Sequence, residues 1–276
     1  MKLALCQMLV GMDKQKNTEK ALGMIREAAA AGADIVSLPE MWNCPYANKY
    51  FRDYAEEADG PTVQALSAIA AELGIYLVGG SIPELKDGNV YNTSFIFDRE
   101  GRVIGTHRKV HLFDIDVEGG IRFMESDTLT AGDEITVVDT EFCRVGVAIC
   151  YDVRFPEQSR RMALMGAKLI ILPAAFNMTT GPLHWDLSMR MRALDNQLYF
   201  AACSPARDMD GVYQAYGNSC VADPWGQFAA HTDEKEGILY CEIDLERVEA
   251  VRNQLPLLKH RRPGIDSLAW EKEVQK

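Results

Sequence analysis

The segment that decides the fold is residues 144–157, with the sequence RVGVAICYDVRFPE. Its first part is apolar and rich in β-branched residues, which predicts a buried strand ending at Cys150. Pro156 suits the first turn of a helix, and we expect that helix over residues 155–165, before Gly166. Cys150 therefore lies where a strand meets a helix, at the edge of an α/β sheet where ligands bind.

A thiol in this position is a candidate nucleophile. Backbone N–H groups and a helix N-terminus stabilise a thiolate, so we expect Cys150 to be ionised more easily than an ordinary cysteine. The alternative is a buried core cysteine. Only Cys150 is closely followed by several charged residues, Asp152, Arg154 and Glu157, which favours its interpretation as a nucleophile. The other cysteines lie in apolar strand-like runs or, for Cys44, in a loop: Cys6, Cys44, Cys143, Cys203, Cys220 and Cys241.

Composition excludes several classes of protein. The chain has 276 residues, is 47% hydrophobic and carries a net charge of −11, which argues against nucleic acid or an anionic membrane as partner. No run approaches the ~20 apolar residues of a membrane span, and we expect no signal peptide. Seven cysteines without a CxxC pair indicate free thiols in a reducing cytoplasm. The five histidines form no HExxH motif, so we expect no metal site.

Strands and helices alternate along the chain. Residues 2–8 and 34–38 read as strands, and a helix capped by Asn17 and ending near residue 31 separates them. A β-α-β unit of this kind predicts a parallel pair. We find no linker, repeat or low-complexity tract, and therefore expect one α/β domain over residues 1–276.

Further candidate residues follow other strands. Glu40 ends the strand at 34–38 among apolar neighbours, which favours a desolvated acid over a solvated loop glutamate. Lys109 ends the second arm of a predicted hairpin, residues 90–97 and 103–109, between His107 and His111. The alternative for this run is a solvated basic edge. The long polar stretch 114–132, which we expect to be a functional loop, carries a second acid, Glu125. The strand-end loops of Glu40, Cys150 and Phe176 are expected at one sheet edge.

Three of these motifs, in this order, resemble the nitrilase superfamily of carbon–nitrogen hydrolases. They are residues 38–40 (LPE), 108–113 (RKVHLF) and 148–157 (AICYDVRFPE). The resemblance is closest to the omega-amidase branch, through residues 76–84, 113–117, 176–185, 195–197 and 204–208. One departure is Glu118-Gly119-Gly120, which replaces the family's usual Pro-Gly and leaves the shape of this loop open.

The resemblance implies a four-layer α-β-β-α sandwich that forms a homodimer and uses no cofactor. By position it implies Glu40, Lys109 and Cys150 as the catalytic three, with Glu125 as a second acid. Amide hydrolysis needs a nucleophile, a proton carrier and an oxyanion stabiliser. These roles fall to Cys150, to Glu40, and to Lys109 with the N–H of Tyr151.

The substrate is expected to be a small amide with a carboxylate. Arg154 lies four residues beyond Cys150, and guanidinium binds carboxylate bidentately. The resemblance also implies Arg154 for this role, and we assign Phe176 and Thr180 to the same substrate site. The alternative is that Arg154 is structural, paired with Asp152 or Glu157.

These features predict a cytoplasmic amidase that hydrolyses the terminal amide of short α-keto acid amides. The expected substrates are 2-oxoglutaramate and 2-oxosuccinamate, converted to the dicarboxylate and ammonia through a cysteine thioester. The alternatives are another branch of the superfamily, acting on deaminated glutathione or an N-carbamoyl compound, and an inactive member acting as a binding protein. A nitrilase proper and a metal-dependent amidase are less favoured.

Overall fold

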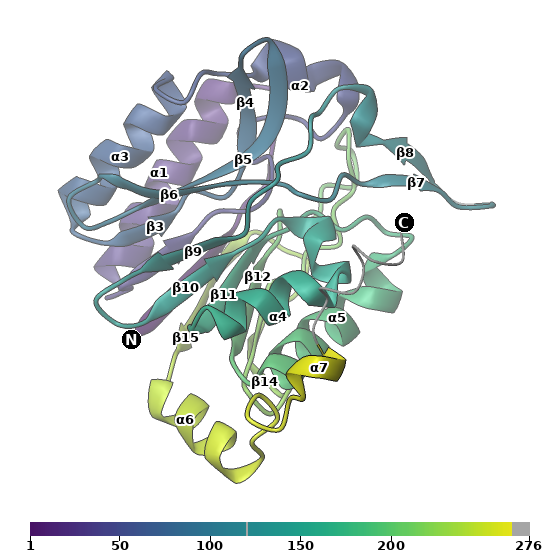
Figure 1. The fold of residues 1–276 in the computed structure, drawn as a ribbon. Coiled ribbons are helices and arrows are strands. Elements are labelled where there is room, and N and C mark those ends of the chain that lie inside the picture. The colour runs from purple at the N-terminus through teal and green to yellow at the C-terminus, as the bar shows by residue number, and fades with distance from the viewer. Residues whose placement is uncertain (120, 267–276) are drawn as a thin grey trace.

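The computed structural model describes residues 1–119 and 121–266 and contains two β-sheets packed face to face, with helices on both outer sides (Figure 1). In the first sheet the strand order is β15-β1-β2-β3-β5-β4, and β6 pairs with β5. Its strands are β1 (Lys2–Gln7), β2 (Ile35–Ser37), β3 (Tyr76–Val78), β4 (Ile82–Lys86), β5 (Asn89–Phe97), β6 (Val103–Arg108) and β15 (Gly237–Glu242). Its central strands, β1 to β3, are parallel, as the β-α-β pattern predicted.

The second sheet has the order β14-β13-β12-β11-β10-β9. Its strands are β9 (Thr136–Asp139), β10 (Arg144–Val147), β11 (Ala167–Pro173), β12 (Tyr199–Cys203), β13 (Cys220–Ala222) and β14 (Phe228–His231). Here β10, β11 and β12 are parallel, so their carboxyl ends meet at one edge. The helices are α1 (Lys14–Ala30), α2 (Asn48–Tyr54), α3 (Pro61–Leu73), α4 (Pro156–Leu164), α5 (Gly181–Asn196), α6 (Leu245–Gln254) and α7 (Pro263–Asp266).

Three apolar layers hold these elements together. Ile25 of α1 and Leu66 of α3 pack on the outer face of the first sheet. Leu5 and Val147 belong to the layer between the two sheets. Met162 of α4 belongs to the third layer, which lies under α4 and α5. This order of layers, helix, sheet, sheet and helix, confirms the predicted four-layer α-β-β-α sandwich.

Two local predictions were wrong. Helix α1 begins at Lys14 because Asp13, not Asn17, is its N-cap, accepting hydrogen bonds from the N–H groups of Gln15 and Lys16. Asn17 is instead buried inside the helix and bonds the backbone of Gly11. The stretch 114–132 is also more ordered than an irregular loop, since it holds the small hairpin β7 (Asp114–Asp116) and β8 (Arg122–Met124) and a 3-10 turn, η1 (Glu125–Asp127).

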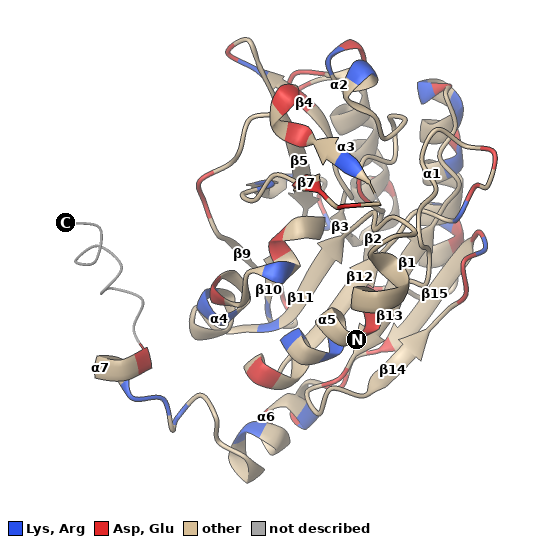
Figure 2. Cartoon of the chain, turned by 90° about the vertical axis from the view of Figure 1, so that its right-hand side faces the viewer, with Lys and Arg blue, Asp and Glu red and all other residues tan. Residues whose placement is uncertain are grey.

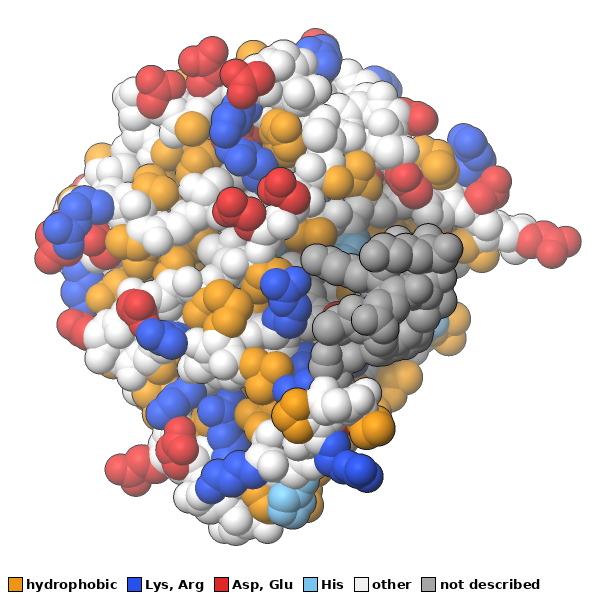
Figure 3. Space-filling model, in the orientation of Figure 1, with side chains coloured by type: hydrophobic (Ala, Val, Ile, Leu, Met, Phe, Trp, Pro, Cys, Tyr) orange, Lys and Arg blue, Asp and Glu red, His pale blue; other side chains and the backbone are white. Residues whose placement is uncertain are grey.

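The C-terminal part of the described chain lies outside the two sheets. Figure 2 shows the segment from α6 to α7 extending past the edge of the sandwich, with the basic residues of the run at 259–262 on it. Residues of this segment and of α4 together line a groove of about 650 Å³. On the face drawn in Figure 3, acidic and basic side chains are interspersed among apolar ones. Within the described ranges, we find no helix long and apolar enough to cross a membrane.

Candidate active site

Loops from both sheets meet at the carboxyl ends of the parallel strands. Glu40 follows β2, Lys109 follows β6, and Cys150 follows β10 at the start of a 3-10 turn, η2 (Cys150–Arg154). The N–H of Ala175, which follows β11, donates to Oε2 of Glu40 over 2.8 Å. This bond joins the loop before Phe176 to the loop of Glu40, so the two loops meet as we predicted. The single sheet edge that we expected is wrong, because β2 belongs to the first sheet and β10 and β11 belong to the second.

The turn that carries Glu40 has little freedom. Trp42 donates its indole N–H to the carbonyl of Gly79 over 2.7 Å, and the N–H of Met41 donates to Oγ of Ser81 over 3.0 Å. Gly80 has φ +63°, and a Cβ there would lie 2.3 Å from the carbonyl oxygen of Pro39. Only glycine fits so close an approach, so the backbone of this turn is locked and aims the Glu40 side chain inward.

Lys109 lies between two carboxylates. Its Nζ is 3.0 Å from Oε1 of Glu40 and 2.9 Å from Oε1 of Glu125, and all three side chains are wholly buried. The solvated basic edge that we considered for this run is therefore wrong. Burial alone would lower the pKa of Lys109, but the charges of Glu125 and Glu40 outweigh it and raise the pKa above its usual value. Lys109 is thus a protonated cation inside the protein.

Two residues of this cluster escaped the sequence analysis. The hydroxyl of Tyr46 lies 2.5 Å from Oε1 of Glu125 and 3.1 Å from Oε1 of Glu40. The amide of Asn92 donates to the same Glu40 oxygen over 2.8 Å. Tyr46 stands only six residues after Glu40, but nothing in a proline-containing loop predicts that its hydroxyl turns back to the acid.

Glu125 is held by the backbone as well as by Lys109. Its Oε2 accepts a 2.7 Å hydrogen bond from the N–H of Phe113, the residue that leads into β7. Burial raises the pKa of Glu125, and the charge of Glu40 raises it further, while Lys109 opposes both effects. The small hairpin β7–β8 therefore returns this second acid to the end of the Lys109 strand.

Cys150 occupies a strained turn. It has φ +44°, in the left-handed region that non-glycine residues rarely adopt, and only 4% of it is exposed. Burial and the negative charge of Glu40 raise the pKa of Cys150 well above its usual value. Our expectation of an easily ionised thiolate is therefore wrong, because desolvation and Glu40 outweigh Lys109. The resting group is a thiol with an adjacent proton acceptor.

Arg154 lies over aromatic rings beyond the thiol. Its Cζ is 4.9 Å from the ring centre of Phe176 and 5.7 Å from that of Tyr151, and its Nη1 is 3.0 Å from Nδ1 of His184. Within residues 1–119 and 121–266 no ion pair joins Arg154 to a carboxylate. Asp152, one of the partners we considered for it, is occupied by His107 and His111 instead.

Thr180 belongs to a tight loop at the start of α5. Its N–H and its hydroxyl both bond Oδ1 of Asn177, over 2.9 and 3.2 Å, and the N–H of Thr179 donates to the same oxygen. The hydroxyl proton of Thr180 is thus already donated to Asn177 within the loop. Only the lone pairs of Thr180, or another group of the loop, remain for further contacts.

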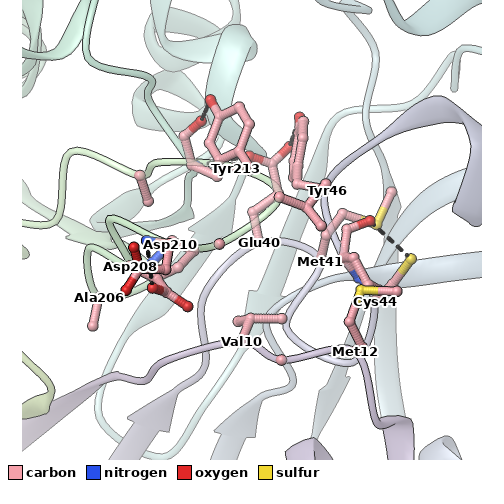
Figure 4. A pocket seen from close by; sticks show the side chains of 17 residues that line it. Val10, Met12, Glu40, Met41, Cys44, Tyr46, Ala206, Asp208, Asp210 and Tyr213 are labelled. Carbon is pink, nitrogen blue, oxygen red and sulfur yellow. Dashed lines mark hydrogen bonds between the residues drawn. The ribbon is translucent and has the colours of Figure 1, made fainter.

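A cavity of about 220 Å³ approaches the acid from the side of the first sheet (Figure 4). It reaches from exposed Met12 to buried Glu40, with Asp208 and Asp210 on its wall. Figure 4 shows the side chain of Glu40 running up between Tyr46 and Tyr213. Neither Cys150 nor Arg154 is among its lining residues, so this cavity borders the acid and not the thiol.

Residues 2–253 match the family described as carbon-nitrogen hydrolase. The chain belongs to the carbon–nitrogen hydrolase family. This confirms the nitrilase-superfamily resemblance that three motifs suggested. As a carbon–nitrogen hydrolase it is an enzyme.

Relatives of this carbon–nitrogen hydrolase cover almost the whole chain. It is 49% identical over 271 residues to omega-amidase NIT2 of Mus musculus, covering 98% of both chains. It is 47% identical over 271 residues to omega-amidase NIT2 of Homo sapiens, again covering 98% of both chains.

Solved structures show the same fold. Saccharomyces cerevisiae Nit3, a branch 10 member of the nitrilase superfamily, has a TM-score of 0.88 at 44% identity, covering 95% of this chain and 96% of that one. A mutant amidase from Nesterenkonia sp. AN1 has a TM-score of 0.80 at 25% identity, covering 96% and 95%. In that amidase the acetamide moiety of fluoroacetamide is covalently attached to the active-site cysteine.

Proposed function

We propose that this carbon–nitrogen hydrolase is an amidase of the omega-amidase type, with Cys150 as nucleophile and 2-oxoglutaramate or 2-oxosuccinamate as substrate. The observation that carries the proposal is the buried group of Glu40, Lys109 and Glu125 beside a strained thiol. The names of the relatives, omega-amidase NIT2 at about half identity over the full chain, support the same activity.

The first half of the reaction forms a thioester. Sγ of Cys150 attacks the amide carbonyl while Glu40 takes the thiol proton, which suits a buried thiol whose pKa is raised by the charge of this acid. Lys109 has three N–H donors, of which two contact Glu40 and Glu125, and its contact with Tyr46 is long at 3.5 Å. The third donor and the N–H of Tyr151 stabilise the oxyanion.

The second half returns the enzyme to its resting state. Glu40 gives its proton to the amide nitrogen, the C–N bond breaks, and ammonia leaves. Glu40 then takes a proton from water, which attacks the thioester, and the C–S bond breaks as the thiol regains its proton. The carboxyl group of Glu40 thus carries the proton in every step, and the hydrogen bond from Lys109 to Glu125 keeps Lys109 in place throughout.

The same proposal assigns substrate selection to Arg154. A cation without a carboxylate partner in the described chain, lying over the rings of Phe176 and Tyr151, suits the free carboxylate of an α-keto acid amide. Thr180 and its loop border the start of the helix that carries His184, and we assign them to the same carboxylate. An acidic protein needs such a local cation to accept an anion.

We further propose a homodimer in the cytoplasm. Helix α5 exposes Leu183, Leu187 and Met191, which are 71%, 66% and 44% exposed and four residues apart on one face. A second copy of the chain would cover this stripe. Light scattering should report a dimer for the parent and a monomer for Leu187→Glu. All seven cysteines are free, which fits a reducing compartment.

Ammonia release from a panel of small molecules tests the activity. The panel holds 2-oxoglutaramate, 2-oxosuccinamate, deaminated glutathione, an N-carbamoyl amino acid and a short nitrile. We expect the highest kcat/KM for the two α-keto acid amides. A preference for deaminated glutathione or the N-carbamoyl compound would move the enzyme to another branch, and the absence of turnover on any of them would indicate a binding protein.

A further inference from the structure

The two histidines that flank Lys109 bind the same carboxylate. Nε2 of His107 lies 3.1 Å from Oδ2 of Asp152, and Nδ1 of His111 lies 2.8 Å from Oδ1. The backbone N–H of His111 donates to Oδ1 as well, over 2.9 Å. Asp152 therefore holds the chain two residues before and two residues after Lys109.

The same carboxylate closes the turn that carries the thiol. The N–H of Ile149 donates to Oδ2 of Asp152 over 3.0 Å, and the N–H of Asp152 donates to the carbonyl of Ile149 over 3.0 Å. Cys150 lies between these two residues, with φ +44°. A non-glycine residue keeps this conformation only where its surroundings enforce it, and these two bonds do so.

Asp152 is an ionised group inside the protein. It is only 1% exposed, and burial alone would raise its pKa, but the hydrogen bonds from His107 and His111 hold the pKa of Asp152 below its usual range. A carboxylate only accepts hydrogen bonds, so each ring nitrogen that faces it carries a proton. Four N–H groups thus donate to the carboxylate of Asp152, two to each oxygen.

We propose that Asp152 is a positioning residue, which uses His107 and His111 to fix the Cys150 turn relative to Lys109. The proposal rests on Cys150 being the nucleophile. Asp152 does not touch the substrate; it sets the distance between the attacking sulfur and the cation that stabilises the oxyanion. Arg154, which selects the substrate, has its own contacts with Phe176, Tyr151 and His184. Loss of the hydrogen bonds to Asp152 therefore lowers kcat and leaves KM close to that of the parent.

The first test replaces the carboxylate by an amide of the same shape. Asp152→Asn should lower kcat by roughly 100-fold, the effect of a misplacement of about 1 Å, with little change in KM. The matched control is Asp223→Asn, because Asp223 is also buried and accepts hydrogen bonds from Trp225 and Gln227 of its own hairpin turn and from Arg247 of α6. That control should lower the melting temperature without lowering kcat per folded molecule.

A second pair of variants, at His111, tests the same inference if Asp152→Asn does not fold. The ring of His111 stacks on Phe155, with 3.5 Å between centroids, and has a partly exposed side chain. Both His111→Asn and His111→Leu lose this stacking, but only asparagine offers an N–H donor where Nδ1 stood. We expect His111→Leu to lose several-fold more kcat than His111→Asn, which separates the hydrogen bond from the packing.

The outcomes separate this inference from the proposed function. An active parent, an inactive Cys150→Ala and an unchanged kcat in folded Asp152→Asn would overturn the inference alone. Equal kcat values for His111→Asn and His111→Leu would also overturn it. So would a rise in KM with an unchanged kcat in Asp152→Asn. An amidase activity that survives Cys150→Ala would overturn the proposed function instead.

Discussion

The ammonium of Lys109 lies 3.0 Å from Oε1 of Glu40, and neither side chain is exposed to solvent. Breaking a buried ion pair leaves an uncompensated charge, so neither residue is freely replaceable. The two members of the pair differ in their effect on the thiol, because the charge of Glu40 raises the pKa of Cys150 and the charge of Lys109 lowers it. Replacing the groups around this pair one at a time separates their contributions.

Glu40→Gln and Glu125→Gln should differ in severity. Glutamine keeps the shape and most hydrogen bonds of either acid, but it cannot carry a proton between the thiol, ammonia and water. Glu40→Gln should therefore lower kcat by about 100-fold to 10,000-fold, the range of general acid–base catalysis. Glu125→Gln should cost on the order of 10-fold, the loss of one hydrogen bond to a charged group. Steady-state ammonia release measures both, and equal or greater damage from Glu125→Gln would reverse the two roles.

Tyr46→Phe removes the hydroxyl that lies between the two acids, 2.5 Å from Glu125 and 3.1 Å from Glu40. We expect about 1–3 kcal/mol lower stability towards urea, because buried acceptors lose a donor, together with a lower kcat. Tyr50→Phe, on α2 outside the cluster, is the control and should change neither quantity. An unchanged kcat in Tyr46→Phe would show that the hydroxyl has no part in aligning the acids.

The ionisation of Cys150 should depend on Glu40. Burial and the negative charge of Glu40 both raise the pKa of the thiol, so removal of that charge lowers it. In Glu40→Gln the rate of alkylation by iodoacetamide should therefore rise at a lower pH than in the parent, although the variant hardly turns over substrate. Mass spectrometry of the labelled peptides, with Cys150→Ala as blank, measures the profile. A profile shifted to higher pH would contradict the electrostatics described above.

The order of labelling among the cysteines is a separate prediction. Cys150 should be labelled before the other six under limiting iodoacetamide, because Glu40 takes its proton as the sulfur attacks the reagent. Cys44, which the sequence places in a loop, is wholly buried, and burial raises the pKa of its thiol. Preferential labelling of Cys44 with activity retained would rule out Cys150 as the nucleophile.

Arg154→Lys should change specificity more than chemistry. Lysine keeps the charge but loses the planar, bidentate geometry, and we expect kcat/KM for 2-oxoglutaramate to fall roughly 30-fold, at about 2 kcal/mol. A neutral amide of similar length should lose far less, since it offers no carboxylate to Arg154. Equal losses for both substrates would make Arg154 structural and remove the main local support for an α-keto acid amide.

Much of the fold follows from local sequence signals. The strand before Cys150, the hairpin that carries Lys109 and the turn at Asp223-Pro224-Trp225-Gly226 all stand where periodicity and turn residues predicted them. The start of α1 was misplaced because both Asp13 and Asn17 suit a cap, and burial of Asn17 against Gly11 decides between them.

The candidate site was predictable only in part. Glu40, Lys109 and Cys150 follow strands and lie in motifs, so each could be predicted from its local sequence. Contacts between distant segments were not: Tyr46, Asn92 and the histidines on Asp152 are brought in by loop conformations that no periodicity encodes. The ionisation of Cys150 was misjudged for the same reason, because a helix N-terminus is visible in sequence, whereas burial beside Glu40 is not.

The most direct test of the account is to trap the thioester. The parent enzyme is mixed with 2-oxoglutaramate, quenched in acid within one turnover, and digested for mass spectrometry. We predict that the peptide containing Cys150 carries the acyl group of the substrate after loss of ammonia. An active enzyme that shows no adduct, or an adduct on any cysteine other than Cys150, would contradict the account.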